Sequence, residues 1–89
     1  MISPQDLKTI QKWAKRYNIH SVYLFGSSLS DEEESNDIDL GIEGIPKEHF
    51  FKLTGELDWM LSKSIDVVDL DSDNPFAGVV RKYGRRIYG

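Results

Sequence analysis

The sequence predicts an α+β fold in which helices pack on a small mixed β-sheet. Helical and extended segments alternate along the chain in the order αββαβα(β). Of the three inner extended segments, one alternates strictly between apolar and polar residues and the others are short runs rich in β-formers. We find no repeat, low-complexity tract or linker, so we expect one domain over residues 1–89.

Composition and charge limit the classes of function. Hydrophobic residues make up 39% of the 89 residues and aromatic ones 11%, which is enough for a folded core. Asp and Glu exceed Lys and Arg by 15 to 11, so no direct binding to nucleic acid is expected. The absence of cysteine excludes disulfides and thiol chemistry. We recognise no signal peptide and no membrane span of about 18 apolar residues, so we expect a cytoplasmic protein without membrane association.

The first helix and first strand are marked by their ends. Ser3, followed by a proline, is a favourable N-cap, and Asp6 three residues on resembles a capping box. Asn18 is expected to end this helix. Residues 21–25 are rich in β-formers and stop at Gly26, which predicts a strand. The apolar face of the helix consists of Leu7, Ile10, Trp13, Ala14 and Tyr17.

The remaining elements follow the same logic. Residues 37–43 alternate apolar and polar, which predicts a strand with Ile38, Leu40 and Ile42 on one face. Residues 65–70 predict a third strand, Phe76–Tyr83 a short helix, and residues 86–88 an edge strand. Between the second and third strands, a helix opened by a proline carries an apolar stripe of Phe50, Leu53, Thr54, Leu57, Met60 and Leu61.

Two aspartates share the polar face of the second strand. Asp37 and Asp39 have Cα atoms about 6.6 Å apart on a strand. Two carboxylates at this spacing repel each other by about 2–3 kcal/mol at an effective dielectric near 20, so the pair needs open water or a cation. Gly41, on the same face, suits either an approaching ligand or a close backbone contact. An edge strand with one solvated face accounts for the pair equally well.

A third aspartate lies inside the apolar run 65–70. Strand propensity and burial both disfavour Asp66 there. If this strand lies beside residues 37–43, Asp66 completes a cluster of three carboxylates, which are ligands that Mg²⁺ prefers. Two such ions would orient an attacking oxygen and a leaving pyrophosphate in line. Asp69 points to the opposite face of the strand and is not expected to join.

Gly26 and Ser27 follow the first strand directly. A glycine lets the backbone approach a phosphate closely, and a serine hydroxyl can donate to it. The pair alone is a weak signal, but its order before Asp-x-Asp on one strand and Asp66 on another is specific. These residues resemble the nucleotidyltransferase superfamily that includes DNA polymerase beta and kanamycin nucleotidyltransferase, and above all its minimal branch. The matching segments are residues 24–27, 36–40 and 65–70, and the likeness extends over essentially the whole chain.

The resemblance implies transfer of a nucleoside monophosphate, typically AMP from ATP with Mg²⁺, to an acceptor hydroxyl. Gly26 and Ser27 would bind the triphosphate. Asp37, Asp39 and Asp66 would hold one or two Mg²⁺ ions, and Asp66 would help to deprotonate the acceptor. The elements use most of the chain, so we expect the acceptor on a partner protein. Minimal members usually pair with a helical HEPN-domain toxin, so the resemblance would make this chain an antitoxin, and we expect a homo- or hetero-oligomer. Candidate exposed aromatics for the partner are Phe51, Trp59 and Tyr88.

The sequence departs from the family pattern after Ser27. Members commonly carry an arginine and a glycine there, whereas residues 28–31 read Ser-Leu-Ser-Asp and further acidic residues follow. Basic residues near the C-terminus would either compensate or complement their own helix dipole; they are Arg81, Lys82, Arg85 and Arg86. Two alternatives therefore stay open: a catalytically degenerate copy that binds and neutralises a partner, and an acidic metal- or protein-binding domain without a nucleotide role.

Overall fold

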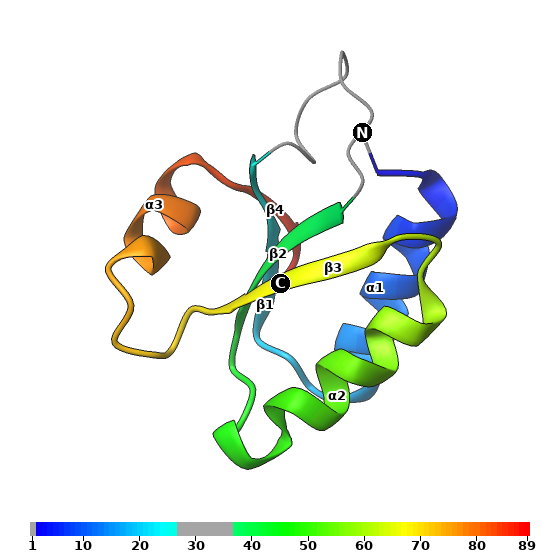
Figure 1. Cartoon of the computed structure of the whole chain (residues 1–89), viewed down its shortest axis with the longest axis horizontal. Helices are drawn as coiled ribbons and strands as arrows, with labels where there is room; N and C mark the ends of the chain where they lie inside the picture. The colour runs from blue at the N-terminus through cyan, green and yellow to red at the C-terminus, as the bar shows by residue number, and fades with distance from the viewer. Residues whose placement is uncertain (1, 27–36) are drawn as a thin grey trace.

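A sheet with helices on both faces forms the structure, a computed structural model that describes residues 2–26 and 37–89 (Figure 1). Within those residues there are three helices and four strands in the predicted order. Their bounds are α1 Pro4–Arg16, β1 Ser21–Leu24, β2 Asp37–Glu43, α2 Lys47–Met60, β3 Ser64–Asp69, α3 Phe76–Tyr83 and β4 Arg85–Tyr88. The α+β class is confirmed.

The sheet is mixed, as predicted. Its strand order is β3-β2-β1-β4, with β2 and β3 parallel and the other two pairs antiparallel. A parallel pair needs a long crossover, and α2 supplies it between β2 and β3. The condition set for Asp66, that its strand lies beside β2, is thereby met.

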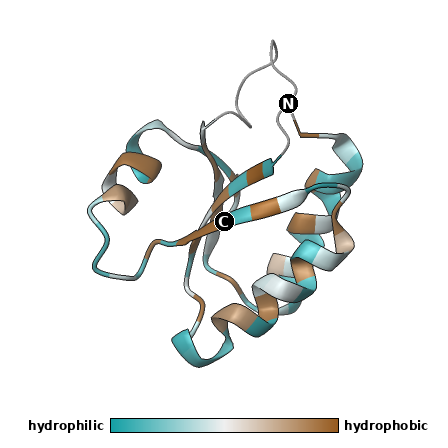
Figure 2. Cartoon of the chain, viewed as in Figure 1, coloured by the Kyte–Doolittle hydropathy of each residue, from teal (hydrophilic) through white to brown (hydrophobic). Residues whose placement is uncertain are grey.

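The two faces of β2 meet different helices. Ile38, Leu40 and Ile42 are at most 3% exposed and belong to the main core with residues of α1 and α2. Figure 2 shows the corresponding alternation of hydropathy along the strand. On the opposite face, a Cβ added at Gly41 would lie 2.7 Å from Val80 Cγ1. Of the two roles open for Gly41, the structure therefore supports close packing, here against α3.

The start of α1 is only partly as predicted. The Ser3 hydroxyl accepts a hydrogen bond from the Asp6 N–H at 3.1 Å, so the N-cap is confirmed. The Asp6 carboxylate, however, accepts from the backbone N–H of Ser62 at 3.2 Å and from the Ser62 hydroxyl. Asp6 thus joins α1 to the turn after α2, and its assignment to a capping box was wrong.

Two predictions of burial need correction. Met60, placed on the apolar stripe of α2, is 44% exposed because the helix ends there. Tyr88 is half-buried and packs against the main core, so it is a poor candidate for a partner surface. Phe51 and Trp59 are 85% and 90% exposed, as expected. No helix in the part of the chain that the structure describes is long and apolar enough to cross a membrane.

Candidate functional site

The glycine turn and the aspartates lie at one end of the sheet. Because β1 and β2 are antiparallel, the end of β1 meets the beginning of β2. The Phe25 N–H donates to the Asp39 carbonyl oxygen at 3.1 Å and extends this pairing by one residue. Gly26 follows at once and is therefore held next to Asp39.

Gly26 is required by two features of this contact. Its φ is +63°, in the left-handed region that favours glycine. A Cβ at this position would lie 2.6 Å from Asp39 Oδ2, closer than real Cβ atoms come. The space that a side chain would take is thus occupied by the Asp39 carboxylate.

The register of β2 and β3 sets Asp66 beside Asp39. The two residues are Cα partners in the parallel pair and share the sheet face that α3 covers further along. Neighbouring strands are about 4.8 Å apart, so both carboxylates start from adjacent backbone positions. Asp37 is paired with Ser64, one pleat nearer the start of the strands. Asp69 pairs with Ile42, and its Oδ1 accepts from the Asp71 N–H at 3.0 Å, outside the site as predicted.

The side chains do not form a closed metal cage. Among residues 2–26 and 37–89, no three carboxylate or imidazole groups gather closely enough to hold a metal ion. The donor chemistry fits Mg²⁺, since carboxylate oxygens are its usual protein ligands and its other positions go to phosphate and water. Ser27 lies outside the described residues. The metal and phosphate roles of these residues stay predictions.

Arg81 does not serve this site. Its guanidinium donates to Glu43 Oε2 at 2.7 and 3.1 Å and to the Leu70 carbonyl at 2.8 Å. Glu43 is at the far end of β2, so Arg81 ties α3 to the sheet away from the aspartates. The Ser21 hydroxyl, and next the Arg81 guanidinium, lower the pKa of the Glu43 carboxyl. The idea that Arg81 compensates for the missing loop arginine was therefore wrong.

Arg86 has a different position. It pairs with Tyr23 across β1 and β4, and its guanidinium carbon is 5.9 Å from the centroid of the Tyr23 ring. Tyr23 in turn pairs with Gly41, so this ring shares a sheet face with the aspartates. Of the four basic residues proposed to compensate, Arg86 is the one that the register of the sheet assigns to this face.

An apolar pocket beside Gly26 was missed from the sequence. It has a volume of about 240 Å³ and lies between the end of β1 and α3, with Phe25, Phe76 and Tyr83 among its lining residues. The rings of Phe25 and Phe76 meet edge to face with centroids 5.5 Å apart. One signal was available: Phe76 and Tyr83 are seven residues apart on a predicted helix and so share one of its faces.

Comparisons with known proteins agree with this architecture. Among the solved structures that match are three of toxin–antitoxin complexes, and likeness at these identities shows the fold alone. One, described as a toxin–antitoxin with AMP-PNP, has a TM-score of 0.76 and is 24% identical. The match covers 93% of this chain and 73% of the chain in that structure. A second, a mutant of an MntA toxin–antitoxin pair, has a TM-score of 0.75 and is 22% identical. The match covers 93% of this chain and 72% of the chain in that structure. The third, the MntA–HepT toxin–antitoxin pair, has a TM-score of 0.74 and is 22% identical. The match covers 98% of this chain and 73% of the chain in that structure.

The sequence comparisons define the family. No curated protein sequence matches the chain. The family model described as "Polymerase beta, Nucleotidyltransferase" matches residues 8–89, nearly the whole chain. The chain therefore belongs to the polymerase beta nucleotidyltransferase family.

Proposed function

We propose that this protein is an antitoxin that transfers AMP from Mg·ATP to a hydroxyl group on its partner toxin, a helical HEPN-domain protein. The observation that carries the proposal is the junction of three strands at one end of the sheet. There, Asp39 is the register partner of Asp66, and its carboxylate takes the space beside Gly26. A nucleotidyltransferase needs carboxylates next to a backbone that a phosphate can approach.

The chemistry divides among these residues. In the transfer, the acceptor oxygen forms a bond to the α-phosphorus as the bond to the leaving pyrophosphate breaks, and the acceptor loses its proton. Asp37, Asp39 and Asp66 would hold Mg²⁺, which when bound supplies positive charge to the phosphates. Asp66, which is exposed, would also accept the acceptor's proton. Gly26 and Ser27 would donate to the triphosphate. Catalysis is then mostly positioning and charge neutralisation.

Two observations support a partner toxin as the source of the acceptor. The structural neighbours are themselves toxin–antitoxin complexes, and one contains AMP-PNP. On this chain, Phe51 and Trp59 of α2 expose large aromatic side chains. Aromatic residues are enriched in the centres of protein interfaces. These facts support a docking role for α2 in the binding of the toxin.

Labelling tests the proposal. The protein is incubated with its toxin, Mg²⁺ and ATP carrying ³²P at the α-phosphate, and transfer to the toxin is followed on a gel. Asp39→Asn should abolish the labelling. Asp73→Asn makes the same change of charge at an exposed turn before α3 and should label like the wild type. Equal labelling by wild type and Asp39→Asn contradicts the assigned role.

A second function, neutralisation of the toxin without turnover, is favoured by one observation. The loop lacks the family's arginine, and Arg81, which we considered as a substitute, is bound to Glu43 and Leu70. The two functions differ in the toxin assay. If binding alone neutralises, Asp39→Asn protects against the toxin as well as the wild type does and no label appears. If transfer neutralises, the variant fails to protect.

A further inference from the structure

We propose that the apolar pocket between α3 and the end of β1 binds the base of the nucleoside triphosphate and selects it by stacking. The inference rests on the proposed function, because it assigns a place for the base of the same nucleotide. It goes further in naming the residues that hold the base and the kind of selectivity that they give.

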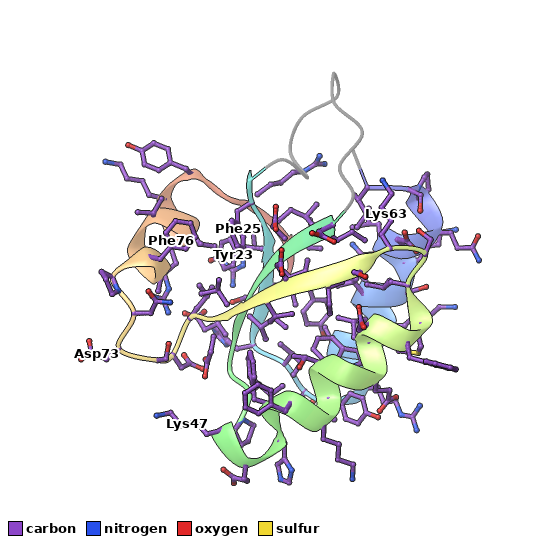
Figure 3. The ribbon with its side chains drawn as sticks, viewed as in Figure 1. Tyr23, Phe25, Lys47, Lys63, Asp73 and Phe76 are labelled. Carbon is purple, nitrogen blue, oxygen red and sulfur yellow. The ribbon has the colours of Figure 1, made fainter. Side chains whose placement is uncertain are left out.

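The pocket offers aromatic faces and almost no polar groups. Its lining includes Phe25, Gly26, Phe76, Val79, Val80 and Tyr83. Three of these side chains are open to solvent, with Phe76 44%, Val79 47% and Tyr83 69% exposed. Figure 3 shows Phe76 of α3 directed toward Phe25 at the end of β1, with Tyr23 beside them. Large apolar side chains left this open on a small domain indicate a binding surface.

Gly26 joins this pocket to the carboxylates. It forms part of the pocket wall, and its missing Cβ would fall 2.6 Å from Asp39 Oδ2. A ligand that extends past Gly26 therefore has its charged end at the aspartates and an apolar end against α3. A nucleoside triphosphate has this distribution, with phosphates at one end and a flat aromatic base at the other.

The lining also determines how the base is read. Apart from the Tyr83 hydroxyl, the side chains of these residues carry no hydrogen-bonding group. Stacking on aromatic side chains tolerates different bases because every base has a π-face. The larger purine ring system makes more contact than a pyrimidine. We therefore expect ATP and GTP to bind similarly and CTP to bind more weakly.

Calorimetry on the full chain tests this with three Mg²⁺-containing titrants: ATP, CTP and inorganic tripolyphosphate. Tyr83→Ala should weaken the binding of ATP by roughly 5- to 150-fold, which is the range for loss of one stacking contact. It should leave the binding of tripolyphosphate unchanged. Tyr83→Phe keeps the ring and should restore ATP binding. Glu48→Ala changes an exposed residue of α2 that does not line the pocket, and it should leave the binding of both ATP and tripolyphosphate unchanged.

Each contrary result has a separate meaning. If Tyr83→Ala binds ATP as the wild type does while tripolyphosphate still binds, the pocket does not hold the base and the proposed function survives. If Tyr83→Ala binds ATP normally but loses affinity for the toxin, the pocket is a partner surface rather than a base site, and the proposed function again survives. If the wild type binds neither ATP nor tripolyphosphate, the proposed function fails and this inference fails with it. If CTP binds as tightly as ATP, selection by stacking is wrong.

Discussion

Gly26 is the residue whose substitution should be most informative. In Gly26→Ala the new Cβ would lie 2.6 Å from Asp39 Oδ2, and alanine at a φ of +63° is itself strained. The strain should cost about 1–2 kcal/mol of folding free energy. Displacement of the Asp39 carboxylate should also weaken the binding of Mg·ATP, by about tenfold or more. Thermal unfolding measures the first effect and calorimetry the second.

Gly78→Ala is the matched control for that change. Gly78 lies in α3 with nothing within 4 Å of an added Cβ, and its φ is not positive. Alanine there should stabilise the helix by up to about 1 kcal/mol. Should Gly26→Ala melt and bind ATP like the wild type, the close contact with Asp39 has no functional meaning.

Glu43 gives a pH-dependent prediction. Its carboxyl accepts from the Ser21 hydroxyl at 2.8 Å and from Arg81, and these bonds lower its pKa in the folded state from 4.5. A lowered folded pKa means that the stabilisation is present above pH 4.5 and is lost as the pH falls through the folded value. Glu43→Gln should therefore lower stability at pH 7 by about 1 kcal/mol.

The difference between Glu43→Gln and the wild type should shrink as the pH drops below 4.5, since the wild-type carboxyl then becomes neutral too. Chemical denaturation at several pH values measures this, with Asp73→Asn as a control for the general loss of one negative charge. A gap that stays constant from pH 7 to pH 3 would show that ionisation of Glu43 does not stabilise the fold.

At the scale of the element, α2 is the surface to test for partner binding. Phe51 and Trp59 are 85% and 90% exposed, so their removal should not disturb folding. Buried aromatic anchors at interfaces commonly contribute 2 kcal/mol or more, so Phe51→Ala and Trp59→Ala should each weaken the toxin complex by roughly thirtyfold. Surface plasmon resonance with immobilised toxin measures the loss.

The control for α2 is Glu48→Ala, an exposed change in the first turn of the same helix. Its affinity for toxin should stay within about threefold of the wild type. If all three variants bind alike, the toxin docks elsewhere. Nucleotide binding should be unchanged in each, because α2 packs against the sheet face opposite to the aspartates.

The elements were predictable because each carries its own local signal. Ser3 and its following proline fix the start of α1, and the strict alternation of β2 gives both its bounds and its buried face. Long-range pairing carries no such signal. The bond of Asp6 to Ser62 joins residues 56 apart in the chain, and the pocket forms only when α3 reaches the end of β1. The proximity of Asp66 to Asp39 could be expected only if β3 lay beside β2, and the sequence does not give the order of the strands.

For the whole molecule, the distribution of charge matters more than its sum. Residues 17–46 contain no Lys or Arg and carry a charge of −7, while the rest of the chain carries +3. All three aspartates proposed to bind a cation therefore lie in this acidic part or on a strand paired with it. Mg²⁺, which also offsets the charge of the bound phosphates, should offset a repulsion between these carboxylates that the metal-free protein retains.

Thermal unfolding of the whole chain tests this coupling between metal, nucleotide and fold. A ligand that binds only the folded state at a hundred times its Kd stabilises it by about 2.7 kcal/mol, which for a domain of this size raises Tm by roughly 10–20 °C. We expect such a rise for the wild type with Mg·ATP. Asp66→Asn should abolish the rise, since it removes one of the proposed ligands.

Without metal, Asp66→Asn should no longer lower Tm relative to the wild type. Asp66 is exposed and is the register partner of Asp39, so loss of its charge relieves repulsion and should leave Tm equal or slightly higher. Asp73→Asn should shift Tm little in either condition. A clear fall in Tm for metal-free Asp66→Asn would mean that this carboxylate holds the sheet together, and the adjacent aspartates would then be structural rather than a site for Mg·ATP.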